Sequence, residues 1–280
     1  MSNKLNFIFF GTPDVASETL EILKENGYLP FKIITSPDKP QGRKMIITPP
    51  PVKTWAEKHN IKYLQPEKLD EAFIDKLKKE SNDLFIVVAY GKIIPETLIS
   101  LPKLGSINIH YSLLPKYRGA SPVESALLNG DEETGITIQK MEFKMDSGPI
   151  MASEKIEILS NEKAPDLRKR LIKIGGELLV KTLPNFTNGK IKLIAQNESE
   201  ATYCKKIKKE DGLIDLKDDP IKNYNKFRAY YNWPRIFFFQ NNKRIIITDA
   251  ILENREFKIL KVLPEGKKEI NYKDFISSNL

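Results

Sequence analysis

Two short apolar runs indicate the fold of this chain: Leu84-Phe-Ile-Val-Val-Ala-Tyr90 and Gly105-Ser-Ile-Asn-Ile-His110. The first is apolar throughout, which is typical of a strand covered on both faces of a sheet. Similar runs at residues 5–10 and 31–35 precede helical patterns, one of them at residues 66–79. Strands that alternate with helices predict an α/β fold with a doubly wound, mostly parallel, Rossmann-like sheet.

The second run carries a polar pair, Asn108 and His110, at its end. Successive strand residues point to opposite faces, so these two side chains share a face while Ile107 and Ile109 share the other. In open α/β sheets, ligands bind where such strands end. An amide and an imidazole can both donate to one developing oxyanion. Either residue alone is more simply explained as a buried group bonded to backbone, whereas the pair favours a catalytic site.

Asp146 is a third candidate, in the loop Lys144-Met-Asp-Ser-Gly-Pro149. An aspartate before Ser-Gly-Pro is by itself typical of a turn. If this loop reaches the edge that carries Asn108 and His110, the carboxylate could favour a charged imidazole or relay protons through water. The strand-to-helix turn at residues 10–14 lacks the Gly-x-Gly-x-x-Gly pattern, so we expect no dinucleotide site.

The composition of the 280 residues is ordinary for a soluble globular protein, and a cytoplasmic enzyme is the class we expect by default. The single cysteine, Cys204, excludes an intrachain disulfide and fits a reducing compartment. No apolar stretch is long enough to span a membrane, and we expect neither a membrane segment nor a signal peptide. With only two histidines, His59 and His110, we expect no metal site. His59 lies at a charged helix end, where we expect it to face solvent.

The formal charge of +8 is uneven, because residues 201–280 hold 17 Lys and Arg against 11 Asp and Glu. A basic tail suggests a polyanionic partner such as nucleic acid, although a solvated lysine-rich surface explains the same counts. Residues 36–53 lack periodicity and predict a long loop. This loop carries Lys39, Arg43 and Lys44, which could bind phosphates or belong to an ordinary surface excursion.

The pattern along the chain predicts two domains. Residues 1–187 form the α/β domain, and residues 188–204 are a polar linker without periodicity. Residues 205–280 hold short strand-like runs, which predict a small β-rich, barrel-like domain.

Several motifs then resemble one known family over nearly the whole chain. They are Phe9-Phe-Gly-Thr-Pro-Asp14, Val88-Ala-Tyr-Gly-Lys-Ile-Ile-Pro95, Asn108-Ile-His-Tyr-Ser-Leu-Leu-Pro-Lys-Tyr-Arg-Gly119, and Gly135-Ile-Thr-Ile138 with Asp146-Ser-Gly148. The second domain adds Asn232-Trp-Pro234. The chain resembles the methionyl-tRNA formyltransferases, which are folate-dependent formyltransferases. The resemblance implies formyl transfer from 10-formyltetrahydrofolate to the α-amino group of initiator methionyl-tRNA. It also implies that Asn108, His110 and Asp146 are the catalytic residues.

The resemblance further implies the binding residues. The folate site would be lined by two segments: Val88, Ala89, Tyr90, Gly91 and Ser112, Leu113, Leu114, Pro115. The tRNA would be bound by Arg43, Lys44 and Lys39 and by the basic C-terminal domain, and the protein would be a monomer.

The resemblance has two departures, and the catalytic set fits more than one activity. The loop Asp146-Ser-Gly-Pro149 is also similar to that of the purine-pathway formyltransferase, which widens the substrate question. Residues 252–257 join two strand-like runs where the family has more chain, so we expect a shortened C-terminal domain. The set also fits a formyltransferase acting on a small amine, such as a purine ribonucleotide or an amino sugar. A hydrolase that releases formate would carry the same residues, and a non-catalytic tRNA-binding module would share the basic tail.

Overall fold

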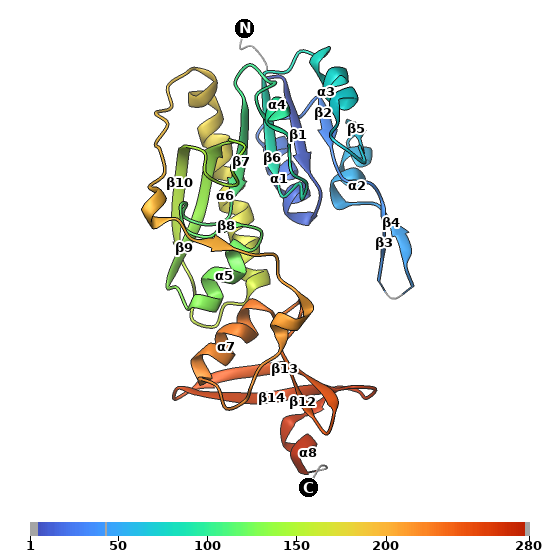
Figure 1. Cartoon of the computed structure of the whole chain (residues 1–280), viewed down its shortest axis with the longest axis vertical. Coiled ribbons are helices and arrows are strands. Elements are labelled where there is room, and N and C mark those ends of the chain that lie inside the picture. Colours follow the sequence, from blue (N-terminus) through green and yellow to red (C-terminus); the bar gives the residue numbers. More distant parts are fainter. Residues whose placement is uncertain (1–4, 43, 278–280) are drawn as a thin grey trace. The chain divides into compact units, whose positions relative to one another are not determined.

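The computed structural model describes residues 5–42 and 44–277. The chain divides into two compact units, whose elements are labelled in Figure 1. Unit 1 comprises Met1–Lys116, Gly135–Glu154 and Leu171–Ala201; unit 2 comprises Tyr117–Thr134, Lys155–Arg170 and Thr202–Leu280. The domains predicted from the sequence, residues 1–187 and 205–280 with a linker at 188–204, are not tested by this division and remain a prediction.

A seven-stranded sheet lies at the centre of the α/β fold. Its strands are β1 (Phe7–Gly11), β2 (Lys32–Ile34), β5 (Lys62–Leu64), β6 (Leu84–Val88), β7 (Ser106–His110), β9 (Glu133–Lys140) and β10 (Ile150–Glu157). The spatial order is β10-β9-β7-β6-β1-β2-β5 (Figure 1). The five strands from β5 to β7 run parallel, and β9 runs antiparallel to β7. The predicted mostly parallel, doubly wound sheet is confirmed.

Helices cover both faces of this sheet. They are α1 (Asp14–Glu25), α2 (Pro51–Lys58), α3 (Glu71–Lys78), α4 (Glu96–Ile99) and α6 (Ala164–Thr187). On one face, Ile8, Phe10 and Val87 pack with apolar residues of α3 and α4. On the other face, Gly175 of α6 lies so close that an added Cβ would come within 3.3 Å of Ile109. Every position of β1 and β6 is buried, as strands covered on both faces require.

Two local predictions need correction. The helix expected at residues 66–79 begins later, because Asp70 accepts a hydrogen bond from the backbone N–H of Phe73 and caps α3. His59 does not face solvent. Its ring lies 4.3 Å from that of Trp55, centroid to centroid, and its Nε2 lies 3.4 Å from Oε2 of Glu21. The end of α2 packs against α1, and a helical pattern alone does not reveal such a neighbour.

The segment expected to be a long loop contains a β-hairpin. β3 (Lys39–Gln41) pairs antiparallel with β4 (Ile46–Thr48), and the hairpin projects from the rest of unit 1 (Figure 1). Asp38 anchors its base, because the carboxylate accepts from Gln65 at 2.7 Å and from Lys53 at 2.7 Å. These two donors hold the pKa of Asp38 below its ordinary value. Strands this short with mostly exposed side chains leave no periodic signal, which explains the missed hairpin.

Unit 2 has its own antiparallel sheet of four strands. They are β12 (Phe237–Gln240), β13 (Lys243–Glu253), β14 (Glu256–Pro264) and β15 (Ile270–Asn271). A two-residue turn with left-handed φ values, 52° at Asn254 and 63° at Arg255, joins β13 directly to β14. The β-rich character and the short connection at residues 252–257 are therefore confirmed.

Helices accompany this sheet: α5 (Pro122–Asn129), α7 (Pro220–Ala229) and α8 (Tyr272–Ser277). α5 packs against α7 within the unit. A short parallel pair, β8 (Arg118–Gly119) and β11 (Tyr203–Cys204), and the 3-10 helices Glu198–Glu200 and Lys209–Gly212 complete the elements. Within the described part of the chain, no helix has the length and apolar character needed to cross a bilayer.

Candidate active site

Four polar side chains share one face of β7 and β9. Asn108 lies opposite Gln139, and His110 lies opposite Thr137, in the antiparallel register of these strands. Residues directly opposite on paired strands project to the same side of a sheet. Asn108 also lies beside Val87 of β6. This polar strip ends at the carboxyl edge of β7, close to where the strand order reverses between β1 and β6.

Asp146 reaches this strip from the loop that follows β9. Its Oδ2 lies 3.7 Å from Nδ1 of His110, and the two side chains are only 17% and 7% exposed. The carboxylate oxygen therefore faces the imidazole nitrogen in a place that is largely screened from water. The structure therefore brings together Asn108, His110 and Asp146, the three residues predicted from the sequence. Their roles in catalysis stay a prediction.

The amide of Asn108 is oriented by its neighbour strand. Its Nδ2 donates to the backbone oxygen of Val87 at 3.0 Å. A carbonyl oxygen only accepts, so the amide nitrogen and not the amide oxygen must face Val87. This bond uses one of the two amide hydrogens.

Two glutamines that the sequence reasoning missed hold Asp146. Nε2 of Gln139 donates to Oδ1 of Asp146 at 2.9 Å. Nε2 of Gln196 lies 2.9 Å from the backbone oxygen of Asp146 and 2.7 Å from that of Gly148. The alternation of Thr137 and Gln139 on a buried strand could have signalled the first of them. Gln196 lies in a segment without periodicity, and no local pattern marks it.

The loop around Asp146 is tightly constrained. Asp146 has a φ of 50°, in the left-handed region that aspartate tolerates better than most residues. A Cβ added at Gly148 would lie 1.8 Å from the backbone oxygen of Lys140, so only glycine fits there. The backbone N–H of Lys140 donates to the oxygen of Pro149 at 3.0 Å, which closes the loop onto the end of β9.

The two predicted folate segments follow neighbouring strands, β6 and β7, and so lie at one edge of the sheet. Val88, Tyr90, Ser112 and Leu114 are buried; Leu113 and Pro115 are half-buried; Ala89 and Gly91 are exposed. Thr137 holds the second segment by donating to the Ser112 oxygen at 2.7 Å and accepting from Leu114 N–H at 3.0 Å. The first segment turns away from the sheet, since Ala89 and Gly91 have φ values of 46° and 81°.

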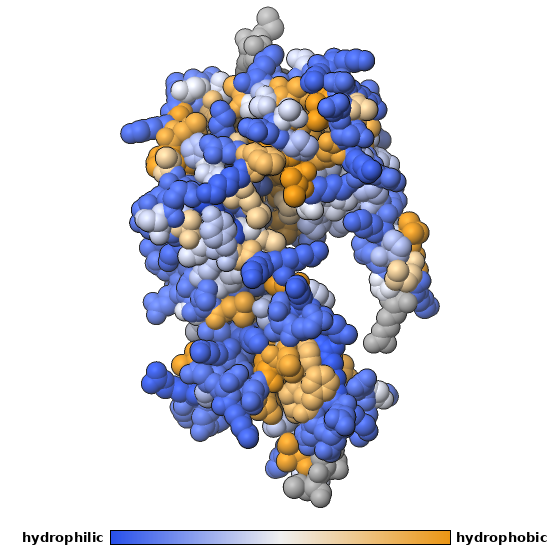
Figure 2. All heavy atoms as spheres, viewed as in Figure 1, coloured by the Kyte–Doolittle hydropathy of each residue, from blue (hydrophilic) through white to orange (hydrophobic). Residues whose placement is uncertain are grey.

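The predicted tRNA-binding residues fall on the projecting hairpin. Lys39 lies on β3 and Lys44 lies in the turn, and both are exposed. Arg43 lies outside the described residues. Three apolar residues of the same hairpin, Met45, Ile46 and Ile47, are 66%, 62% and 62% exposed. Figure 2 shows hydrophobic atoms beside hydrophilic ones on the projecting arm.

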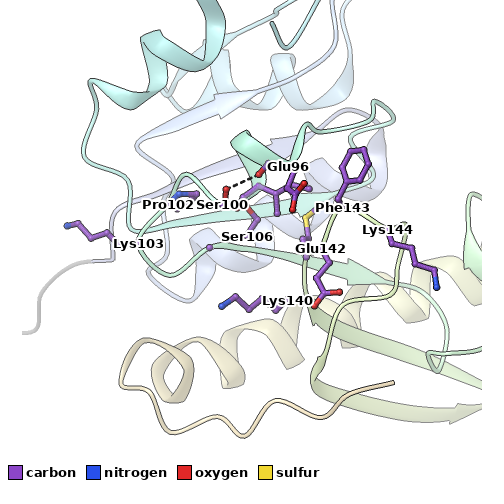
Figure 3. A pocket seen from close by; sticks show the side chains of 12 residues that line it. Glu96, Ser100, Pro102, Lys103, Ser106, Lys140, Glu142, Phe143 and Lys144 are labelled. Carbon is purple, nitrogen blue, oxygen red and sulfur yellow. Dashed lines mark hydrogen bonds between the residues drawn. The ribbon is translucent and has the colours of Figure 1, made fainter. Parts of the chain in front are cut away.

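A separate cavity of about 620 Å³ opens at the opposite edge of the sheet (Figure 3). It is lined by Ser106 at the start of β7, Lys140 at the end of β9, and side chains of α4 and of residues 141–144. The three predicted catalytic residues do not line it. Among residues 5–42 and 44–277, no group of three or more His, Cys, Asp and Glu is placed to hold a metal ion.

Comparison with known proteins defines the class. Residues 3–183 match the formyl transferase family model, and residues 206–259 match the model of the formyl transferase C-terminal domain. The chain belongs to the formyl transferase family. Within that family it groups with the methionyl-tRNA formyltransferases. The protein of that name from Caldicellulosiruptor saccharolyticus is 43% identical over 90% of this chain and 82% of its own length.

Solved structures share the fold at lower identity. Methionyl-tRNA formyltransferase from Clostridium thermocellum superposes with a TM-score of 0.62 at 17% identity, covering 95% of this chain and 99% of its own. The N-formyltransferase from Helicobacter canadensis, solved with folinic acid and dTDP-3-aminofucose, superposes with a TM-score of 0.68 at 20% identity, covering 89% and 88%.

Proposed function

We propose that this protein transfers the formyl group of 10-formyltetrahydrofolate to the α-amino group of methionine on initiator tRNA. One observation carries the proposal: Asp146 Oδ2 lies 3.7 Å from His110 Nδ1, on the face shared with Asn108. This assembly occurs in a formyl transferase whose 43% identical relative is named methionyl-tRNA formyltransferase.

The assembly suits attack on a formyl carbon. As the amine attacks, the formyl oxygen becomes an alkoxide, and the second N–H of Asn108 with an N–H of the His110 imidazole would stabilise it. Donors of this kind act in a buried site where their charge and dipoles are only weakly screened. Losing one such donor typically lowers the rate by about a hundredfold to a thousandfold.

The reaction does not need a strong general base from the protein. An α-amino group has an ordinary pKa of about 8, so a useful fraction is neutral near pH 7 and can attack. Asp146 would orient the imidazole of His110 and, through water, help move a proton from the attacking amine to the folate nitrogen. Placement of the two substrates should therefore matter as much as proton transfer.

The folate segments fit a flat heterocycle. Ala89 and Gly91 are exposed beside buried Val88, so backbone donors and acceptors of this segment would lie next to an apolar wall. The segment of residues 112–115, held by Thr137, would supply the facing wall. We therefore assign folate binding to Val88–Gly91 and Ser112–Pro115 as part of the proposal.

The tRNA would contact the hairpin and the basic C-terminal region. Lys39, Arg43 and Lys44 would bind phosphates, and Met45, Ile46 and Ile47, exposed in the free protein, would pack against unpaired or splayed bases. Residues 201–280, with 17 basic against 11 acidic side chains, would add salt-sensitive contacts to the tRNA body.

A formylation assay tests the proposal. The purified protein, supplied with 10-formyltetrahydrofolate, should formylate initiator methionyl-tRNA in preference to elongator methionyl-tRNA, purine ribonucleotides and nucleotide-linked amino sugars. Preference for a small amine would reject the tRNA substrate. Formate release without an acceptor would identify a hydrolase, and absence of folate turnover would leave a tRNA-binding module.

We also propose that residues 1–187 form the catalytic domain, 188–204 the linker and 205–280 the tRNA-binding domain. The protein would be a cytoplasmic monomer, and its reaction would need no metal. The proposed proton transfers use side chains and solvent alone. Light scattering should give a mass near 32.1 kDa, and activity should survive a chelator. A dimer mass, or activity lost to the chelator and restored by a metal, would contradict these points.

A further inference from the structure

We infer that Gln139 and Gln196 position Asp146 for the reaction, and that the segment joining the two predicted domains is therefore part of the catalytic machinery. The inference rests on the proposed function. We assign both glutamines an indirect role: each would act through Asp146, one on its carboxylate and one on its backbone.

Gln196 is turned inward from an exposed segment. Along residues 192–200 it is the one residue that is not exposed. Its single amide nitrogen bridges two backbone oxygens, those of Asp146 at 2.9 Å and Gly148 at 2.7 Å. Both oxygens belong to the turn that sets the direction of the Asp146 side chain. A polar side chain that leaves solvent to join two carbonyls of one turn fixes the shape of that turn.

The segment that carries Gln196 is fixed to the sheet at Ile194, two residues earlier in the sequence. Ile194 and Ile150 exchange both backbone hydrogen bonds, at 2.9 Å and 2.7 Å. This bridge ties the segment to the start of β10, directly after the Asp146 loop. Without the Gln196 bonds, Asp146 would more readily leave its φ of 50°, a conformation that costs free energy for any residue with a Cβ.

Gln139 acts on the carboxylate. The side chain is 2% exposed, and its Nε2 donates to Asp146 Oδ1 at 2.9 Å, which leaves Oδ2 to face His110. Its amide oxygen is buried and has no hydrogen-bond partner within residues 5–42 and 44–277. A buried acceptor without a donor destabilises the folded state, and an apolar side chain would avoid that loss. The buried amide oxygen is thus a cost, and the bond from Nε2 to Asp146 is what the side chain gains at this position.

The two glutamines should control turnover and not substrate affinity. A shift of about 1 Å in a group that acts on the reacting atoms can lower a rate about a hundredfold. Side chains that do not touch either substrate should leave ground-state binding unchanged. Loss of either amide should therefore lower kcat with little change in KM.

The test uses Gln139→Met and Gln196→Met, which keep the side-chain length and remove the amide. Each should lower kcat by about 10- to 100-fold and leave KM for 10-formyltetrahydrofolate and methionyl-tRNA within about twofold. Glu133→Gln is the matched control on β9, the strand that carries Gln139. It removes an exposed ion pair with Lys155, in which the two side chains are 54% and 59% exposed, and should leave kcat unchanged.

A second readout does not depend on activity. The chain has two histidines, so the ring resonances of His110 and His59 can be assigned by NMR. The His110 signals in both methionine variants should move toward their positions in Asp146→Asn, while those of His59 stay in place. The inference would be overturned if the two methionine variants kept the wild-type kcat and left the His110 signals in place. It would also be overturned if a smaller folded fraction of the variants fully explained their loss of kcat. If the wild-type protein formylates no amine, the proposed function fails instead, and the NMR comparison still tests the positioning.

Discussion

Asp146 shares its two carboxylate oxygens between two neighbours: Oδ2 lies 3.7 Å from His110 Nδ1, and Oδ1 accepts from Gln139 at 2.9 Å. Each neighbour comes from a different strand, β7 or β9. The carboxylate is therefore held at two points. Its direction relative to the imidazole is set by the sheet as well as by its own loop.

Asp146→Asn should lower kcat by about a hundredfold or more, because the imidazole loses the anion that faces it. The fold should survive, since an amide of the same shape still accepts from Gln139. Steady-state formylation and the thermal unfolding midpoint are the measurements. Asp75→Asn, at a side chain 63% exposed on α3, is the control. Turnover near wild type in Asp146→Asn would remove the role assigned to this carboxylate.

Asn108→Ala should lower kcat by about a hundredfold to a thousandfold while KM for both substrates changes little. The reason is that the second amide hydrogen of Asn108 is proposed to act only on the developing alkoxide. Asn271→Ala, which removes an exposed amide in unit 2, should have no such effect. An increase in KM without a fall in kcat would show that Asn108 only binds substrate.

Arg43→Ala and Lys44→Ala should raise KM for methionyl-tRNA far more than KM for folate, because their charges are proposed to contact phosphates. The loss should shrink as salt rises, since counterions already weaken those contacts in the wild-type protein. Lys78→Ala on α3 is the control, because its ammonium pairs with the exposed Asp75. Equal losses on both substrates would count against a tRNA-binding hairpin.

Thr137→Val should destabilise the protein by about 1–3 kcal/mol, because the Ser112 oxygen and the Leu114 N–H lose a buried partner. The loosened segment should also raise KM for folate. Urea unfolding and folate titration are the measurements, and Thr97→Val on the exposed side of α4 is the control. A change confined to KM for tRNA would contradict the folate role of residues 112–115.

Alkaline pH should lower the free energy of unfolding because two tyrosines are buried in the folded protein. Burial raises the pKa of Tyr90 and of Tyr230 to about 12, against about 10 in an unfolded chain. The unfolded chain thus loses these protons first. The contribution of each tyrosine to the free energy of unfolding is complete below pH 10. It falls as pH rises from about 10 toward 12, by up to about 1.4 kcal/mol per pH unit for each group.

Tyr90→Phe should reduce this alkaline loss. At pH 8 the variant should keep its free energy of unfolding, because the Tyr90 hydroxyl is buried without a hydrogen-bond partner within the described residues. Urea unfolding at pH 8 and pH 10.5 is the measurement. The same pH dependence in wild type and variant would show that Tyr90 does not contribute.

Local patterns predicted some parts of the site and missed others for identifiable reasons. Asn108 and His110 were predictable because alternation along a strand dictates which side chains share a face. The hairpin of β3 and β4 was not, because three-residue strands with mostly exposed side chains carry no periodicity. Gln196 was not, because its partners are backbone oxygens of a distant turn.

The sequence by itself determined the doubly wound sheet and the edge at which its polar strand ends. It could do so because burial on both faces demands unbroken apolar runs, and a strand repeats every two residues. Only the tertiary structure decided that Asp146, Gln139 and Gln196 meet beside His110. That meeting depends on the antiparallel register of β9 with β7 and on a chain segment folding back from residue 194, and these long-range contacts leave no mark in any short stretch of sequence.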